Sequence, residues 1–574
     1  MSHNGKTVTT NKAKADIFAS HYAKVSSLKF NKQDRDEIRN TKKKIYSNGP
    51  EVECPSFTTR ELNLAIKKMK RKGAPGNDDI PPSFLKELGP KARQELLAIC
   101  NSSLQDADVP QLWRHGIIIP LLKQGKPASE LASYRPICLT SCVVKTIERM
   151  ICNRLYTMAE VNGWLCNEQA GFRKYRSTED QIVKLIQRIS DGFQARPQAL
   201  RTVMVLLDYS KAYDKTWKER LLSKIHDLGT PRPITRWIAA FLRTRTAQVL
   251  VNGTKSKNVR MKQGLPQGSV LSPLLFLLFI NDISKVIPDD VESPLFADDA
   301  SLYSQHADLL VAQGRLQVAV SAVEQWSTDN KLELNVDKSC TYFFTTNKKE
   351  HSWRPKIKLL GKDMKFGEGK NESDPKFLGV TLDKGLAFTN HVNDVCSRVT
   401  NRRKILFCLS SKQWGWKKRN LKRIYVTMIR SVMDYAAIGW QPWLSKTQFK
   451  KLEVAQNACL RAITGQYANS DLECIRAEAG VPSYRTHSDR MIAIGYEKGM
   501  RLPLNYPRRE AIENEVRHRL KKSSFKQHAE KIIEELSIAN APREPIAIHF
   551  GESAEIPHVN WEVTDNLDIK QKEH

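Results

Sequence analysis

The sequence has no hydrophobic stretch long enough to cross a lipid bilayer. The longest apolar run, residues 270–280, is interrupted by Ser272 and Pro273, whereas a membrane-spanning helix needs about 20 apolar residues. The first residues, Met-Ser-His-Asn-Gly-Lys-Thr, are polar and lack the apolar core of a secretory signal peptide. We therefore expect an intracellular protein without a membrane partner, present in the nucleus and the cytoplasm.

The cysteines show no disulfide or zinc-binding pattern. There are 11 of them, an odd number, scattered from Cys54 to Cys474, which is typical of reduced intracellular thiols. Cys138 and Cys142 are close in sequence, but no second pair with histidines follows at zinc-finger spacing. We expect neither a disulfide framework nor a structural zinc ion.

Acidic residues are too few to balance the basic ones. The chain has 92 Lys and Arg against 62 Asp and Glu, which gives a formal net charge of +30. A surplus of this size favours a polyanionic partner, because neutralised phosphates release their counterions. The 40% hydrophobic content of the 574 residues predicts folded cores and argues against global disorder. The expected partner is therefore a nucleic acid.

Among the acidic residues, the adjacent pair Asp298 and Asp299 is the most informative. The pair lies between short apolar runs in Ser-Pro-Leu-Phe-Ala-Asp-Asp-Ala-Ser-Leu-Tyr, as at the tip of a strand-turn-strand hairpin. Adjacent carboxylates repel each other unless a cation or a basic group offsets the repulsion. A solvated surface turn is the simplest alternative for such a pair.

A third aspartate, Asp208, favours a metal site over a surface turn. It directly follows the apolar residues 203–207, which are typical of a central strand buried on both faces. Carboxylates from a strand end and from a neighbouring hairpin can meet, and such a cluster suits Mg²⁺ completed by substrate phosphates. Two ions about 3.5–4 Å apart would stabilise the attacking and leaving oxygens of a phosphoryl transfer. The alternative is that Asp208 merely ends a strand.

Three segments resemble, in order, the palm motifs of reverse transcriptases. They are Asp-Tyr-Ser-Lys-Ala-Tyr-Asp (208–214), Gly-Leu-Pro-Gln-Gly-Ser-Val-Leu-Ser-Pro (264–273) and Phe-Ala-Asp-Asp (296–299). Their order and spacing resemble those of non-long-terminal-repeat retrotransposon polymerases, in the jockey-like branch, over residues 60–480. The resemblance implies an α+β right-hand polymerase with fingers, palm and thumb.

The resemblance also implies roles for single palm residues. Asp208, Asp298 and Asp299 would be the catalytic ligands of two Mg²⁺ ions, with Mn²⁺ as a substitute. Lys338, in Leu-Asn-Val-Asp-Lys-Ser, would donate a proton to the leaving pyrophosphate. A lysine that is simply solvated after a strand is the alternative for Lys338.

Further residues are implied to hold the incoming nucleotide. Tyr213 would be the aromatic gate beneath the sugar, where a flat ring collides with a bulky 2′ substituent. Gln267 would pack beside the nucleotide, and Gly264 and Gly268 would let the backbone approach the substrate closely. For Tyr213 the alternative is packing in the core.

Two upstream segments, residues 119–137 and 168–181, resemble the finger motifs of the same family. A triphosphate needs cationic donors, and arginine suits its geometry better than lysine. Arg173 is the first candidate for the phosphates, and Arg135 and Lys126 are candidates for phosphates or the template backbone. Solvated basic loops are the alternative.

The sequence further predicts how the chain divides. We expect a basic N-terminal extension or linker (1–55), fingers (56–200), a palm of antiparallel sheet and helices (201–385), a helical thumb (386–480) and a C-terminal region of unassigned role (481–574). Strands are expected at 202–208, 294–297, 300–304, 331–335 and 340–346, and thumb helices at 392–409, 421–435 and 449–463. Candidates to stack on bases, with core packing as the alternative, are Trp414, Trp416, Trp440 and Trp443.

The predicted function is RNA-directed DNA synthesis by two-metal-ion nucleotidyl transfer, primed at the target, with an RNA template, a DNA primer and dNTPs as partners. No endonuclease is expected before residue 56 or after Cys474, so we expect the polymerase portion of a longer element protein that works with a separate or upstream endonuclease. One alternative is a catalytically silent nucleic-acid-binding protein from a decayed element copy. Another is a telomerase-like or maturase-like polymerase.

Overall fold

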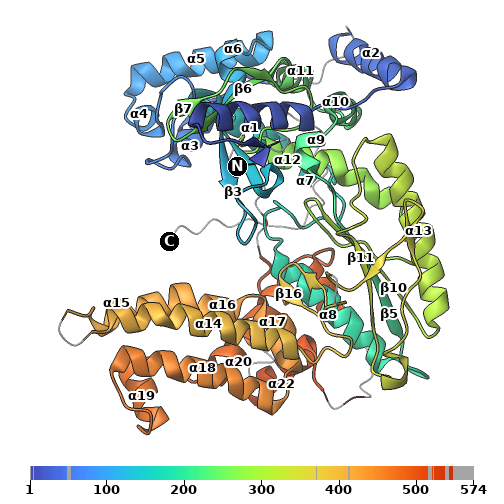
Figure 1. Ribbon diagram of the computed structural model, residues 1–574, viewed down its shortest axis with the longest axis vertical. Helices are drawn as coiled ribbons and strands as arrows, with labels where there is room; N and C mark the ends of the chain where they lie inside the picture. The colour runs from blue at the N-terminus through green and yellow to red at the C-terminus, as the bar shows by residue number, and fades with distance from the viewer. Residues whose placement is uncertain are drawn as a thin grey trace. The chain divides into compact units, whose positions relative to one another are not determined.

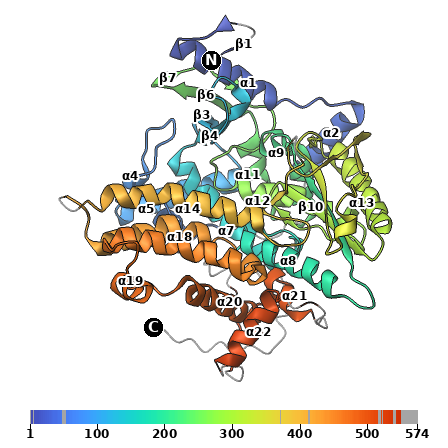
Figure 2. The same ribbon diagram turned by 60° about the horizontal axis from the view of Figure 1, so that its bottom comes forward.

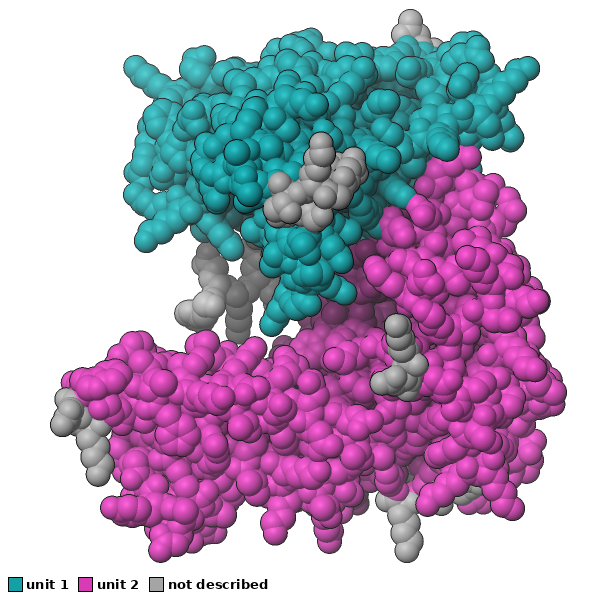
Figure 3. Space-filling view, viewed as in Figure 1, with its two compact units in different colours: residues 1–165, 211–279, 549–574 teal, residues 166–210, 280–548 magenta. Residues whose placement is uncertain are grey.

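The computed structural model describes residues 2–3, 6–47, 54–369, 372–411, 414–514, 520, 522–536, 542–546 and 548, and Figure 1 shows it as a ribbon. The chain forms two compact units, which are coloured separately in Figure 3. Unit 1 comprises residues 1–165, 211–279 and 549–574, and unit 2 comprises residues 166–210 and 280–548. Helices and sheets are mixed, so the predicted α+β class is confirmed. Within the described part of the chain, no helix is both long and apolar enough to span a membrane.

Unit 1 combines helices with a five-stranded sheet of order β4-β3-β6-β7, in which β8 also pairs with β6. Its elements are β1 (Ser2–His3), β2 (Lys6–Thr7), α1 (Asn11–Val25), α2 (Lys32–Tyr46), α3 (Thr59–Lys67), α4 (Pro82–Lys86), α5 (Pro90–Asp106), α6 (Gln111–Arg114), β3 (His115–Leu122), η1 (Leu131–Ser133), β4 (Tyr134–Leu139), α7 (Cys142–Val161), α9 (Ala212–Lys215), α10 (Lys218–Asp227), α11 (Arg232–Leu242), β6 (Thr246–Val251), β7 (Thr254–Lys255), β8 (Val259–Arg260) and α12 (Ser272–Ile280), whose last residue belongs to unit 2.

The first long helix, α1, is part of the core of unit 1. Thr10 caps its N-terminus, because the Thr10 hydroxyl accepts from the Ala13 amide. Ala15, Phe18, Ala19 and Tyr22 recur at helical spacing and are buried, and the last three share a core cluster with sheet residues such as Val249. One face of α1 therefore packs against the sheet of unit 1.

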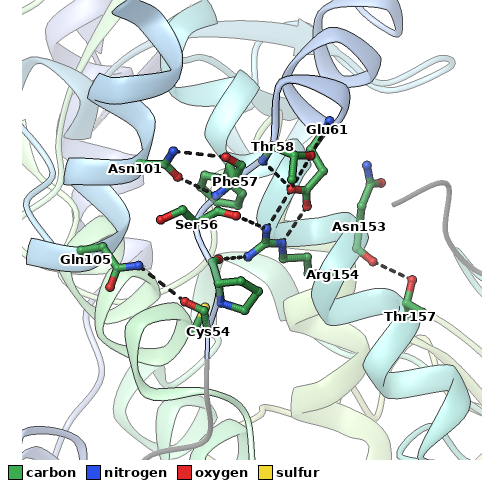
Figure 4. Close-up of polar contacts among 11 residues, drawn as sticks. Cys54, Ser56, Phe57, Thr58, Glu61, Asn101, Gln105, Asn153, Arg154 and Thr157 are labelled. Atoms are coloured by element: carbon green, nitrogen blue, oxygen red, sulfur yellow. Dashed lines mark hydrogen bonds and ion pairs between the residues drawn. The ribbon is translucent and has the colours of Figure 1, made fainter. Parts of the chain in front are cut away.

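A buried ion pair fixes the start of α3 to α7, as Figure 4 shows. Thr58 and Glu61 form a capping box at the N-terminus of α3. The Glu61 oxygens also accept from Arg154 Nε and Nη2 at 2.7 and 2.8 Å, and both side chains are only 6% exposed. The Arg154 guanidinium donates further to the Pro55 and Ser56 carbonyls. Each of the three nitrogens of this buried guanidinium therefore donates at least one hydrogen bond.

Unit 2 contains a second five-stranded sheet, of order β14-β11-β5-β10-β9. Its elements are α8 (Thr178–Gln194), β5 (Arg201–Leu207), η2 (Asn281–Val286), β9 (Leu295–Phe296), β10 (Asp299–His306), α13 (Leu309–Asp329), β11 (Cys340–Phe344), η3 (Lys348–Glu350), β12 (Lys358–Leu359), β13 (Lys362–Asp363), β14 (Lys365–Phe366), β15 (Lys376–Phe377), β16 (Val380–Thr381), α14 (Thr389–Leu409), α15 (Lys418–Ile424), a π-helical turn (Tyr425–Arg430), α16 (Ser431–Asp434), α17 (Ala437–Trp440), η5 (Gln441–Trp443), α18 (Lys446–Thr464), α19 (Leu472–Ala479), α20 (Tyr484–Met500), α21 (Pro507–Glu513) and α22 (Phe525–Glu535).

The central strand of this sheet is β5, and it pairs antiparallel with β10 on one side and with β11 on the other. Val203, Met204 and Val205 are fully buried, as expected for an apolar run in the middle of a sheet. Helices α8 and α13 both contact β5. Four of the five strands expected in this region are therefore confirmed, as β5, β9, β10 and β11.

The strand expected at residues 331–335 is wrong. This segment begins with Lys331 at a φ of 56° and forms only a single antiparallel bridge, between Leu334 and Tyr209. Its alternating apolar residues are nevertheless used, because Leu332 and Leu334 are buried. The period-two pattern here marks a buried loop, not a paired strand.

From α14 onward unit 2 is helical, as Figure 2 shows. The predicted helices at 392–409, 421–435 and 449–463 are confirmed as α14, the α15–α16 segment and α18. Helices α20, α21 and α22 share a core with Val183 of α8 and Ile438 of α17. Arg508 of α21 adds two charged contacts to α8, at 2.6 Å to Asp180 and 2.7 Å to Glu179. The helices α20 to α22, which belong to the region of unassigned role, therefore pack against α8, a helix that contacts the sheet of unit 2.

Candidate active site

The strand register of unit 2 places two of the predicted carboxylates side by side. Leu207, the last residue of β5, pairs with Ala300 of β10. Continuing this antiparallel register by one residue sets Asp208 opposite Asp299, which begins β10. Both aspartates line a cavity of about 290 Å³. The two residues therefore meet through sheet pairing alone.

Lys338 lies on the other side of Asp208. Its Nζ is 3.5 Å from Asp208 Oδ2, and it lines the same cavity. The backbone of Asp208 is fixed by this neighbouring loop, because its amide donates to Ser339 Oγ and its carbonyl accepts from the Asn335 amide. The Lys338 side chain is exposed, so its ion pair with Asp208 contributes little to stability but supplies a positive charge at the carboxylate.

Asp298 belongs to the two-residue turn between β9 and β10. Phe296 pairs with Asp299, which leaves Ala297 and Asp298 as the turn. Ala297 adopts a φ of 57°, in the left-handed region, as one residue of a tight hairpin must. The predicted strand-turn-strand hairpin is therefore confirmed, with Asp298 at its tip.

The three carboxylates influence one another electrostatically. The pKa of Asp299 is raised to about 6, first because its carboxylate is partly withdrawn from water, and then because Asp298 and Asp208 are close to it. In the described part of the chain, no three His, Cys, Asp or Glu side chains stand close enough to hold a metal ion by themselves. The donor set still fits Mg²⁺, which takes few protein carboxylates and completes its shell with substrate phosphates and water.

A buried glutamine, Gln169, holds the turn that carries Asp298. Its Oε1 accepts from the amides of Ala297 and Gly171, both at 2.8 Å, and its Nε2 donates to the Ala297 carbonyl at 3.4 Å. The backbone on either side of Gln169 is bonded to Leu295, through Glu168 and Ala170. Sequence reasoning missed this residue, although its segment was noted for Arg173.

Gly171 completes the contact between this segment and the hairpin. A Cβ at Gly171 would lie 2.4 Å from the Ala297 nitrogen, which is closer than atoms can pack. Only glycine therefore allows the segment and the turn to approach so closely. Together with Gln169, Gly171 limits how far the turn can move.

Arg173, the predicted phosphate ligand, has a structural role in this arrangement. It is buried, and its guanidinium donates to the carbonyls of Cys166 and Gln169 at 2.7 and 3.1 Å. These bonds fix the loop that presents Gln169. A direct contact between Arg173 and phosphate stays a prediction.

The predicted nucleotide-binding residues Tyr213, Gln267 and Gly268 belong to unit 1. The Tyr213 ring stacks on Phe276, with ring centres 4.4 Å apart and planes inclined by 18°. Its carbonyl accepts from the Leu265 amide, so the residue that bears the ring also anchors the loop that leads to Gln267.

Gln267 donates from Nε2 to Asp214 Oδ1 at 2.9 Å. Two glycines of the same loop are needed for packing within the chain. Cβ atoms at Gly264 and Gly268, which have φ values of 85° and 127°, would lie 2.3 and 2.4 Å from the carbonyl oxygens of Asp214 and Cys138. These glycines therefore allow close packing against the backbone of the chain itself, and a close approach to the substrate stays a prediction. Sequence reasoning gave Asp214 no role.

The ionisation of Asp214 gives a prediction for stability against pH. Burial raises the pKa of Asp214 to about 6, although the Gln267 hydrogen bond and two lysines oppose the rise. Between about pH 4 and pH 6 the folded chain therefore keeps a proton that the unfolded chain has released. The free energy of unfolding should decrease as pH rises through this range, by up to about 1.4 kcal/mol per pH unit.

Urea unfolding of the wild type and of Asp214→Asn at several pH values tests this prediction. Because asparagine does not titrate, the variant should gain stability relative to the wild type between pH 4 and pH 6. A difference between the two proteins that stays constant over this range would contradict the assignment.

The other residues predicted to contact nucleic acid, two basic residues and four tryptophans, differ in whether a ligand can reach them. Lys126 and Arg135 are exposed near and on the β3–β4 hairpin of unit 1, where a ligand can reach them. Of the four tryptophans proposed to stack on bases, Trp440 and Trp443 are buried and Trp414 and Trp416 are exposed. The prediction is therefore wrong for Trp440 and Trp443, whose rings pack in the core.

Known proteins resemble this chain over most of its length. Residues 122–382 match the family model described as reverse transcriptase (RNA-dependent DNA polymerase). The chain is 30% identical over 448 residues to the "Probable RNA-directed DNA polymerase from transposon BS" of Drosophila melanogaster, a match that covers 75% of this chain and 48% of the relative. It is 29% identical over 424 residues to the "RNA-directed DNA polymerase from mobile element jockey" of the same species, covering 71% of this chain and 44% of the relative.

A third relative is the "Probable RNA-directed DNA polymerase from transposon X-element" of Drosophila melanogaster, which is 27% identical over 479 residues. That match covers 81% of this chain and 50% of the relative. The chain thus spans about half the length of these relatives.

Proposed function

Residues 122–382 belong to the reverse transcriptase family, in a chain related to the polymerases of jockey-like mobile elements, and from this premise we propose that the protein synthesises DNA on an RNA template. The observation that carries the proposal is the convergence of Asp208, Asp298 and Asp299 at one edge of the sheet in unit 2. A catalytically silent descendant would be under no constraint to keep this arrangement.

The three carboxylates would hold two Mg²⁺ ions, or Mn²⁺ in their place. When bound, such ions stabilise negative charge on the oxygens of the reacting phosphate. Asp208 is held for this purpose by Ser339 and Asn335, and Asp298 by the turn that Gln169 grips. These contacts fix the backbone that carries the two carboxylates before substrate arrives, which lowers the cost of organising the site.

Lys338 has two roles in the proposal. Its ammonium group lies beside Asp208 and offsets part of the repulsion among the carboxylates. It is also a candidate to give a proton to the leaving pyrophosphate, because its side chain is exposed and lines the cavity.

In unit 1, Tyr213 would exclude sugars with a 2′-hydroxyl, and Gln267 and Gly268 would border the nucleotide. The stacking of Tyr213 on Phe276 supports a gate role, since this contact restricts the rotation of the Tyr213 ring. The Asp214 contact similarly restrains Gln267. Lys126, Arg135 and Arg173 would meet phosphates of the nucleotide or the template.

We assign the right-hand names to the elements on this basis. The sheet of unit 2 with α8 and α13 would be the palm, the helices from α14 to α18 the thumb, and the β3–β4 hairpin with the helices around it the fingers. The partners would be an RNA template, a DNA primer and dNTPs, in keeping with the net charge of +30. The protein would act in the nucleus and the cytoplasm, with a separate or linked endonuclease that provides the primer.

Primer extension by the purified full chain tests the proposed function. The substrates are a DNA primer annealed to a defined RNA strand, the four dNTPs and Mg²⁺. We expect extension to the end of the RNA, and no comparable extension with rNTPs. A chain that binds the RNA–primer hybrid but adds no nucleotide would support the silent binding protein instead.

Gln169 provides a prediction about how the site is positioned. Gln169→Met keeps the side-chain volume but removes the hydrogen bonds to Ala297 and Gly171. We expect primer extension to fall about 10–100-fold, as for other residues that orient metal ligands, with a higher Mg²⁺ concentration needed for half-maximal rate.

Gln441→Met is the matched control for this variant. Gln441 is also buried in unit 2, and it makes hydrogen bonds to Met433, Tyr484 and Ser488 among the helices. Both variants should lose stability, but only Gln169→Met should change the Mg²⁺ requirement. Equal Mg²⁺ requirements in the two variants would rule out a positioning role for Gln169.

A further inference from the structure

One end of the helical bundle in unit 2 gathers exposed aromatic side chains. Among the described residues, the aromatic side chains that are more than half exposed are Phe84 (60%), Phe172 (58%), Phe407 (55%), Trp414 (65%), Trp416 (51%) and Tyr467 (76%). Of the last four, Phe407 is in the final turn of α14, Trp414 and Trp416 belong to the connection between α14 and α15, and Tyr467 belongs to the connection between α18 and α19. We call these four residues the aromatic end.

The two connections lie next to each other. Lys418, two residues after Trp416, forms an ion pair with Glu478, and Glu478 also accepts from Gln466, the neighbour of Tyr467. Lys422 of α15 donates to the carbonyl of Gly480, just after α19. Figure 1 shows α15 and α19 at the same end of the bundle. The segments that carry the exposed rings therefore lie at the same end of the bundle.

The α14–α15 part of this surface is strongly basic, whereas the α18–α19 part carries the exposed Asp471 and Glu473. From residue 402 to residue 423 the sequence contains no Asp or Glu, and its basic residues are Arg402, Arg403, Lys404, Lys412, Lys417, Lys418, Arg419, Lys422 and Arg423. Lys404, Lys417, Arg419 and Arg423 are exposed. Arg403 also lies over the Phe407 ring, 5.3 Å from its centre, so cation and aromatic face are interleaved.

We infer that the aromatic end binds single-stranded nucleic acid, with its rings stacking on unpaired bases and its cations on the backbone. An aromatic ring exposed to water has a higher free energy than one covered by a flat apolar partner, and every unpaired base offers such a face. A duplex does not, because its bases already stack on each other. The charges select a polyanion over a neutral or basic protein surface.

Under the proposed function, the natural ligand is an unpaired stretch of the RNA to be copied, and in this respect the inference rests on that function. The surface differs from the proposed catalytic site in its chemistry, because it contains rings and cations but no carboxylate cluster. It would retain the RNA near the enzyme without taking part in nucleotide addition.

Binding of short fluorescent oligonucleotides to the full chain tests the inference. The probes are a 12-nucleotide unstructured RNA, the DNA of the same sequence and the corresponding duplex, and the variant is Trp414→Ala/Trp416→Ala. We expect the Kd for single-stranded RNA to rise about tenfold or more, with little change for the duplex. Single-stranded DNA should follow the RNA if stacking dominates, and should be unaffected if the 2′-hydroxyl is read.

Two controls sharpen the test. Phe84→Ala removes a similarly exposed ring from unit 1 and should leave all affinities unchanged. Trp416→Phe keeps a ring at its position, so it should bind RNA more tightly than the double tryptophan variant. Lys417→Ala/Arg419→Ala should weaken RNA binding mainly at low salt, since phosphate contacts are screened. An unchanged Kd for RNA in the tryptophan variant, or an equal loss for RNA and duplex, would overturn the inference.

Nucleotide addition separates this inference from the proposed function. On a fully annealed hybrid with a single templating nucleotide, the tryptophan variant should add that nucleotide as fast as the wild type. If the wild type itself adds nothing, the proposed function fails, while the RNA-binding comparison still decides whether the aromatic end binds RNA.

Discussion

Replacing Asp298 by asparagine should lower RNA-templated nucleotide addition by roughly 1,000-fold or more. The substitution keeps the size of the side chain at the tip of the β9–β10 turn but removes the negative charge. A metal ion at a phosphoryl-transfer site contributes several kcal/mol of charge stabilisation, and each 1.36 kcal/mol is a factor of ten in rate. Gln169 holds the turn through the backbone of Ala297, and asparagine matches aspartate in size, so we expect the fold to be kept.

The measurement is the single-turnover rate of primer extension, together with thermal unfolding and Mn²⁺ binding followed by electron paramagnetic resonance. Asp289→Asn is the matched control, because Asp289 is an exposed aspartate of the same unit and its loss changes the net charge equally. Asp298→Asn should lose activity and Mn²⁺ affinity but not melting temperature. Equal activity in the two variants would remove the metal role from Asp298.

Replacing Arg154 by methionine should destabilise unit 1 by about 3–5 kcal/mol. The substitution leaves the Glu61 carboxylate buried without its cation, and breaking one side of a buried ion pair has this order of cost. The Pro55 and Ser56 carbonyls also lose their donors, as Figure 4 indicates. Urea unfolding with a probe in unit 1 measures the loss.

The double variant Glu61→Leu/Arg154→Met provides the control. With both charges gone, no unpaired ion stays in the core, so most of the stability lost in Arg154→Met should return. Arg71→Met removes an exposed partner of Glu87 and should cost less than about 1 kcal/mol. An equal loss in Arg71→Met and Arg154→Met would contradict the burial argument.

Local pattern was sufficient to predict much of the sheet in unit 2. The apolar run at residues 203–207 is typical of a buried strand, as β5 shows, and Asp208 follows it where the chain leaves the core. The short runs on either side of Asp298 form the hairpin that they predict. These elements depend on neighbours in sequence, which is why the carboxylates were found without a structure.

Contacts between distant segments could not be predicted in the same way. Gln169 and Ala297 are 128 residues apart, and nothing in the sequence around a single glutamine indicates that its amide grips a remote turn. The same applies to Arg173, which has the chemistry of a phosphate ligand but is used to fix carbonyls. Burial decides such roles, and burial depends on the whole fold.

The tryptophans illustrate this limit at a finer level. Trp414 and Trp416 lie in a short connection and are exposed. Trp440 ends α17, Trp443 ends the adjoining 3-10 turn η5, and both are buried in the core. Composition treats the four alike, because an aromatic ring suits both a core and a stacking surface. Only the position of each ring in the packed helices separates them.

The central claim is that Asp208, Asp298 and Asp299 form the centre of an RNA-directed DNA polymerase. The most direct test is to sequence the product that the full chain makes on an RNA of defined, non-repeating sequence with a DNA primer, dNTPs and Mg²⁺. The account predicts DNA complementary to the RNA, made by the wild type and absent with Asp208→Asn at equal RNA occupancy. Complementary DNA made equally by Asp208→Asn, or no complementary DNA from a wild type that binds the hybrid, would contradict it.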